Sequence, residues 1–121
     1  MSYFPIPKRF YQGQLSASDA ALYTAPAAPT SGPPPKSIVK EVIVCNTDTV
    51  ARTVTLRVRS GAVSGTTQEI LHVYSLAAAT TVVLVLRTVM EAGHIISGLA
   101  SSADVVTLTI SGVELLTVPT A

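Results

Sequence analysis

The side chains that usually carry catalysis or bind metals are few in this sequence and stand apart from one another. The two histidines are His72, inside an alternating apolar run, and His94, which follows a glycine. Neither lies at a metal-ligand spacing to the single cysteine, Cys45, or to a carboxylate. Cys45 follows three β-branched residues, so we expect a buried thiol that behaves as a small hydrophobic side chain. The sequence therefore predicts no metal site, no cofactor and no intrachain disulfide.

The carboxylates are also scattered. The 7 acidic residues occur singly, at Asp19, Glu41, Asp48, Glu69, Glu91, Asp104 and Glu114. A glycosidase pair can come from distant strands, so spacing alone does not exclude one, but the chain has no tryptophan to stack a sugar. The glycines form no phosphate-binding loop. Ser60-Gly61 and Ser111-Gly112 are typical of turns rather than of nucleophile elbows. We therefore expect a protein that is not an enzyme and has no catalytic residues.

The composition indicates a surface that is partly covered in use. Charged residues make up 12% of the chain and the mean hydropathy is +0.49, whereas a typical soluble domain has about 25% charged residues. A membrane protein would explain this, but the most apolar stretch, residues 76–86, is interrupted by Thr80 and Thr81 and is shorter than the ~20 residues of a spanning helix. The beginning of the chain shows no signal peptide. The remaining explanation is burial against other subunits.

The net charge of +1 provides no field that would attract nucleic acid or an anionic membrane. Arg52, Arg57 and Arg59 lie close together, and we interpret them as a solvated strand face. The sequence predicts neither a nucleic-acid nor a membrane partner.

The chain divides by composition near residue 36. Residues 1–36 hold all but one of the 8 prolines and most of the aromatic residues. We expect this part to be an extended arm and linker, with a possible edge strand at residues 20–26 and polyproline character from Pro26 to Pro35. The aromatic side chains Tyr3, Phe4, Phe10 and Tyr11 are predicted to dock on a neighbouring subunit. The alternative, in which the arm folds back onto its own domain, stays open.

Residues 37–121 have the chemistry of β-strands. Val, Ile, Leu and Thr dominate, and seven short strands are expected at residues 37–46, 52–59, 69–76, 80–87, 95–100, 105–110 and 113–118. A helix over residues 71–90 is the competing interpretation, but the β-branched run that begins at Thr80 disfavours it. Residues 37–46 are apolar on both faces except at Lys40 and Glu41, which suits a central strand covered on both sides. The sequence predicts a single, small, all-β domain of the sandwich or jelly-roll type.

Several segments of this sequence resemble a family of small proteins encoded by tailed bacteriophages, thought to be structural or accessory proteins of the virion. The segments are residues 22–26, 38–47, 86–93 and 106–114, and the likeness covers about residues 20 to 116. It consists of patterned strands and turns rather than of an active-site motif. Family members often have an acidic residue after the glycine of the Glu-Ala-Gly turn, where this chain has His94, so no shared ion site is implied.

The resemblance implies a virion role, and the low charge and the Pro-rich arm agree with it. We expect a capsid decoration (cement) protein that stabilises a phage head through homo-oligomeric contacts, with a trimer as one arrangement, and through its arm. Its partners would be other copies of itself and the major capsid protein or other virion proteins, on particles assembled in the host cytoplasm. A tail, neck or fibre-base accessory protein is the first alternative. A glycan-binding β-sandwich module is the second.

Overall fold

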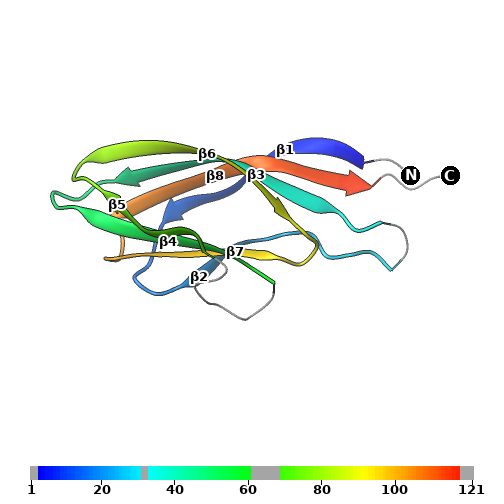
Figure 1. The fold of residues 1–121 in the computed structure, drawn as a ribbon, viewed down its shortest axis with the longest axis horizontal. Helices are drawn as coiled ribbons and strands as arrows, with labels where there is room; N and C mark the ends of the chain where they lie inside the picture. The colour runs from blue at the N-terminus through cyan, green and yellow to red at the C-terminus, as the bar shows by residue number, and fades with distance from the viewer. Residues whose placement is uncertain (1–2, 31–32, 61–68, 118–121) are drawn as a thin grey trace.

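The computed structural model describes residues 3–30, 33–60 and 69–117, and every regular element in these ranges is a β-strand. Figure 1 shows the strands arranged in two layers. The strands are β1 (Tyr3–Gln14), β2 (Ala20–Thr24), β3 (Lys36–Asn46), β4 (Arg52–Arg59), β5 (Glu69–Leu76), β6 (Thr80–Met90), β7 (Ile95–Ala100) and β8 (Val106–Thr117).

The strand order identifies the architecture. Sheet A has the order β1-β8-β3-β6 and sheet B the order β2-β7-β4-β5, and all neighbouring strands are antiparallel. Only β4 and β5 follow one another within a single sheet; every other connection crosses from one sheet to the other. Two four-stranded sheets linked in this way form an eight-stranded jelly roll. The prediction of an all-β sandwich is confirmed.

The core lies between the two sheets and is built by alternation along each strand. On β3, for example, Val42 and Val44 are fully buried, whereas Ile43 between them is only half-buried. Side chains of successive strand residues point to opposite faces, so each strand contributes every second residue to the core. The buried apolar set is Phe10, Leu15, Ala25, Val39, Val42, Val44, Val54, Leu56, Leu76, Met90, Ile96, Ala100, Val106, Leu108 and Ile110.

The predicted arm is wrong for Tyr3–Gln14, because this segment is strand β1 of sheet A. It pairs with β8 from Tyr3↔Thr117 to Gln14↔Thr107. Pro5 and Pro7 are compatible with this placement because β1 is an edge strand, where a missing N–H does not interrupt the sheet. As expected for residues 20–26, Ala20–Thr24 forms an edge strand, β2 of sheet B. The boundary expected between residues 36 and 37 therefore separates parts of one sandwich rather than an arm from a domain.

Two of the expected strands are one. Residues 105–110 and 113–118 were expected to be joined by a turn at Ser111-Gly112, but β8 runs without interruption from Val106 to Thr117. The glycine serves packing instead of turning. A Cβ at Gly112 would collide with the carbonyl oxygen of Ile38 and lie 3.0 Å from the Phe10 ring. Only glycine lets β8 approach β3 and Phe10 this closely.

Candidate functional site

The most unusual feature of the molecule is the side of sheet A that faces away from sheet B, which we call the outer face. On β6 the alternation turns Val82, Leu84 and Leu86 toward the core. The residues between them point outward, and Val83, Val85 and Val89 are 55%, 73% and 52% exposed. Three large exposed aliphatic side chains on one strand are uncommon on a protein surface that stays in water.

The neighbouring strands extend this apolar surface across the sheet. The strand register places Val89 beside Ile38, which in turn lies beside Val113. Further along the sheet, beyond the Glu41↔Val85 pair, Val83 lies beside Ile43. These neighbours are half-buried, and the row with Val113 continues to Pro7 on β1. Apolar side chains of the outer face therefore lie on all four strands of sheet A and not on β6 alone.

A line of register shifts crosses the middle of the outer face. The pairing of β1 with β8 shifts between Arg9 and Tyr11, and β3 shifts against both of its neighbours between Val39 and Glu41. These shifts lie at one level, because Arg9 and Glu41 both pair with Ser111. A β-bulge re-aims the side chains beside it. Here Lys40 is exposed and Glu41 half-exposed, so two consecutive residues of β3 escape the core.

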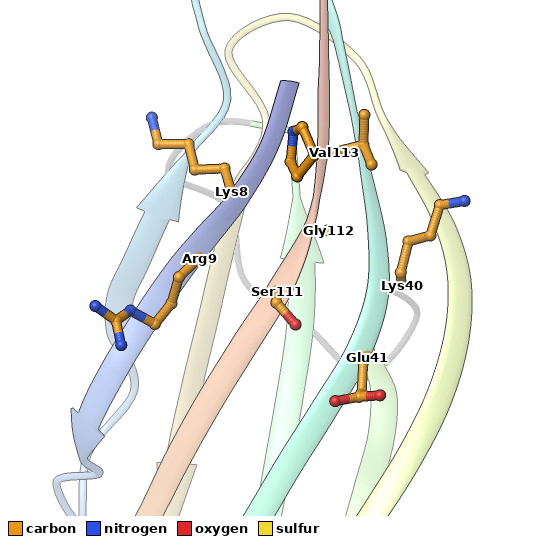
Figure 2. A pocket seen from close by; sticks show the side chains of 8 residues that line it. Lys8, Arg9, Lys40, Glu41, Ser111, Gly112 and Val113 are labelled. Carbon is orange, nitrogen blue, oxygen red and sulfur yellow. The ribbon is translucent and has the colours of Figure 1, made fainter. Parts of the chain in front are cut away.

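The bulges leave an open hollow of about 520 Å³. Its lining comes from three strands: Pro7, Lys8 and Arg9 on β1, Lys40 and Glu41 on β3, and Ser111, Gly112 and Val113 on β8. Figure 2 shows Lys8 and Arg9 extending to one side of the hollow and Lys40 to the other, with Glu41 and Ser111 between them. The charged ends diverge instead of converging on one point, so the hollow is shaped for a broad contact rather than for a small ligand.

Three charged residues on the outer face remain available to a partner. Lys8 is paired with Glu114, and Arg9 donates to Gln12 Oε1 at 2.7 Å. By contrast, the ion pairs within the described residues include none of Lys40, Glu41 and Arg87. Arg87 is exposed on β6 where that strand passes Lys40, between the pairs Val39↔Thr88 and Glu41↔Val85. Two cations and one carboxylate thus stand together among apolar side chains.

The four aromatic residues predicted to dock on a neighbour have different environments. Phe10 is 7% exposed and belongs to the core. Tyr11 is half-buried against the core, and its hydroxyl donates to the carbonyl oxygen of Gln14 at 3.2 Å. Phe4 is 39% exposed. The backbone of Tyr3 pairs with Thr117, and its side chain lies outside the described part. Phe10 and Tyr11 are therefore packed in their own domain, and of the described side chains in this set only Phe4 is exposed enough to meet a partner.

A buried polar cluster between the sheets was not expected from the sequence. Glu114 on β8 is 6% exposed and accepts hydrogen bonds from the Tyr23 hydroxyl at 2.5 Å and from Lys8 at 3.2 Å. Because Tyr23 uses its proton for Glu114, its oxygen accepts the hydrogen bond from the Ser37 hydroxyl at 2.9 Å. Burial, followed by the hydrogen bond to Glu114, raises the pKa of Tyr23 above its ordinary value. The cluster joins the two sheets where β1, β2, β3 and β8 meet.

The residues first considered for chemistry do not come together. His72 is exposed on β5 and His94 lies half-buried in the turn before β7. Cys45 is half-buried rather than buried, because the alternation of β3 gives the core positions to Val44 and Asn46. In the part of the chain that the structure describes, no three His, Cys, Asp or Glu side chains form a cluster that could hold a metal ion. Among the same residues, no helix has the length and apolar character needed to cross a membrane.

Among the described residues, Arg52 and Arg57 of β4 are paired with carboxylates of their own chain. Arg52 and Asp48 lie 2.6 Å apart, and the hydrogen bond from Arg52 lowers the pKa of Asp48. Arg57 lies 3.3 Å from Asp19. The expectation of a fully solvated face is thus corrected for Arg57, whose side chain is mostly buried at the start of β2.

Comparison with solved structures finds a similar fold in a virus. A chain from the structure of infectious bursal disease virus, Gx strain, superposes with a TM-score of 0.52 at 13% sequence identity. The match covers 94% of this chain and 32% of that one, so this protein corresponds to about a third of the viral chain. A chain from the Gt strain of the same virus gives a TM-score of 0.39 at 11% identity over 95% of this chain and 29% of that one. At such identities the likeness shows the fold alone. No protein-family model and no curated protein matches the sequence.

Proposed function

We propose that this protein is a non-enzymatic structural protein of a virus particle, acting as a decoration (cement) subunit on the capsid of a tailed bacteriophage. In this role it binds other copies of itself and the major capsid protein or another virion protein. The particle to which it adds would assemble in the host cytoplasm.

The observation that carries the proposal is the jelly roll with an apolar outer face on sheet A. Jelly rolls are a common architecture of viral capsid domains, and the Gx-strain chain with a similar fold comes from a virus. The exposed residues Val83, Val85 and Val89 give the domain a surface that is stabilised by burial at about 25 cal/mol per Å² of apolar area, before the costs of association. A subunit that binds other copies of itself and the capsid needs such a surface.

Phe4 retains part of the docking role expected for the N-terminal residues. It is exposed near the beginning of β1, at the end of sheet A where Phe4 pairs with Leu116. We propose that it contacts a neighbouring virion protein at this end of sheet A. Phe10 and Tyr11 support this contact only by holding β1 in the sheet.

The two alternatives predict different surfaces. A tail, neck or fibre-base protein would use the same apolar face, so location on the particle decides between it and a capsid role. A glycan-binding module needs exposed aromatic rings on which sugars stack. Tyr74 on β5 is half-buried against the core, and Phe4 is the one aromatic side chain among the strongly exposed hydrophobics in the described ranges. This distribution favours the structural role over glycan binding.

The proposal is tested on particles of a phage that carries the gene. Purified particles are analysed by quantitative mass spectrometry and then by electron microscopy with gold-labelled antibody against this protein. Many copies per particle with gold on the head are the expected result. Gold confined to the tail or neck selects the first alternative, and absence from washed particles overturns the virion role. Binding of the purified protein to a glycan array would select the second alternative, a glycan-binding module.

A further inference from the structure

We propose that the outer face of sheet A is a self-association surface, on which a second copy of this chain packs sheet A against sheet A about a two-fold axis. This inference rests on the proposed structural role and names the partner and the surface. It follows from the apolar rows, from the area of the face and from the arrangement of its charges.

The outer face of sheet A is apolar along β6 and β3. Strand β6 carries three valines on its outer side, separated by two and by four positions, and each is more than half exposed: Val83, Val85 and Val89. The strand beside them, β3, has apolar residues on both of its faces, although among the described strands sheet B covers only its inner face. Sheets with an apolar outer face are stabilised by packing on another sheet about 10 Å away, with side chains interdigitating. A second copy supplies a sheet with the matching pattern.

The outer face also has the area that a stable dimer needs. Sheet A has 4 strands, and its two strands on the β6 side have 11 residues each. With a strand spacing of about 4.8 Å and a rise of about 3.3 Å per residue, the face measures roughly 19 Å by 36 Å, or about 700 Å². Two such faces in contact bury roughly 1,400 Å², which lies within the range of about 1,200–2,000 Å² for specific, stable interfaces. The outer face is therefore large enough for a dimer without help from other parts of the chain.

The charges of the outer face can pair between two copies. Lys40, Glu41 and Arg87 stand near the middle of the face and form no ion pair within the described part of their own chain. A two-fold axis through this group places Glu41 of one copy opposite Arg87 of the other, and the reverse. An isologous interface requires a patch that complements itself, and a carboxylate beside cations satisfies this. The net charge of +1 adds little repulsion between copies.

Sedimentation velocity of the purified full chain over a micromolar concentration series tests the surface. The wild type is expected to dimerise. Val85→Glu is expected to raise the Kd for self-association by about 100-fold or more, because it replaces the most exposed valine of the face with a charge and puts a second carboxylate beside Glu41 at the centre of the contact. Val50→Glu is the matched control, since Val50 is 49% exposed on the loop between β3 and β4, away from the face. It is expected to leave the Kd unchanged, and thermal unfolding checks that both variants are folded.

A charge exchange between two variants tests the proposed pairing of Glu41 with Arg87. Glu41→Arg and Arg87→Glu are each expected to abolish the dimer, because like charges then meet across the axis. Mixing the two variants is expected to restore it as a heterodimer, since each copy then offers the charge that the other lacks. A contact within one chain cannot produce this rescue.

The outcomes separate this inference from the proposed function. A wild-type protein that stays monomeric, or a Val85→Glu variant that dimerises as well as wild type, overturns the self-association surface. Either result leaves particle binding, measured by mass spectrometry, as an independent finding. Conversely, a dimer that depends on Val85 with no copies on particles supports the surface and overturns the virion role.

Discussion

The rings of Phe10 and Tyr23 stack across the interior of the sandwich, with their centroids 4.2 Å apart and their planes inclined by 14°. Phe10 comes from β1 in sheet A and Tyr23 from β2 in sheet B. The pair therefore joins the two N-terminal strands, one from each sheet, and fixes the beginning of the chain in the core.

Phe10→Ala is expected to destabilise the domain by about 3–5 kcal/mol, because it removes a buried ring and leaves a cavity beside Tyr23. Urea denaturation followed by circular dichroism measures this. Phe4→Ala on the same strand is the control and should cost little, since its ring is exposed. Equal stability of Phe10→Ala and wild type would mean that β1 does not contribute to the core and acts as an arm.

Tyr23→Phe is expected to cost about 1–2 kcal/mol at neutral pH, because Glu114 then loses a hydrogen-bond donor in a buried site. The pH dependence has a definite sign. The folded state raises the pKa of Tyr23 above its unfolded value, so the neutral hydroxyl contributes stability that is complete below about pH 10 and is lost as the pH rises further. The difference in unfolding free energy between wild type and Tyr23→Phe should shrink from neutral pH to about pH 11. A constant difference would mean that Tyr23 is not held neutral by the fold.

Asn46 closes one end of the sandwich with its side chain. Its Nδ2 group donates to the carbonyl oxygens of Val50, Leu76 and Ala77 at 3.0, 3.3 and 3.1 Å, and its Oδ1 accepts from the Asp48 amide at 3.0 Å. Asn46→Ala is expected to cost about 2–3 kcal/mol in unfolding free energy, because buried carbonyls lose their donor. Asn46→Asp should cost more, since it points oxygen at oxygen. Thr49→Ala, exposed on the same loop, is the control and should stay within about 0.5 kcal/mol of wild type.

Gly112→Ala is expected to cost about 2 kcal/mol or more, because its methyl group would overlap the Ile38 carbonyl and press on the Phe10 ring. Ser111→Ala, the preceding residue, points to the outer face and should change stability by less than about 0.5 kcal/mol. The melting temperatures of the two variants provide the comparison. A Gly112→Ala protein as stable as Ser111→Ala would show that β8 and β3 can separate at the bulge without cost.

The sequence could predict the strands because their signals are local. The β-branched run from Thr80 favoured a strand over a helix, and β6 is that strand. Residues 37–46 were expected to form a central strand, and β3 lies between β8 and β6 in sheet A. Ser111-Gly112 misled because a serine-glycine pair is common in turns, and only the proximity of Ile38 and Phe10 shows that this glycine is needed inside a strand.

The candidate site was largely beyond the reach of the sequence. The low charge indicated a covered surface, and residues 37–46 were expected to be covered on both faces. The local sequence does not show that the outer face of sheet A stays exposed. Phe10 and its proline-rich surroundings suggested an arm because prolines exclude helix, yet the same prolines are tolerated on an edge strand.

By itself the sequence determined an all-β domain with sparse reactive chemistry, since strand propensity, periodicity and composition are properties of neighbouring residues. Only the tertiary structure decided that β1 completes sheet A, that the outer face is open, and that Glu114 meets Tyr23 from 91 positions away. The physical reason is that pairing between distant strands depends on the packing of the whole core. No local pattern specifies that packing.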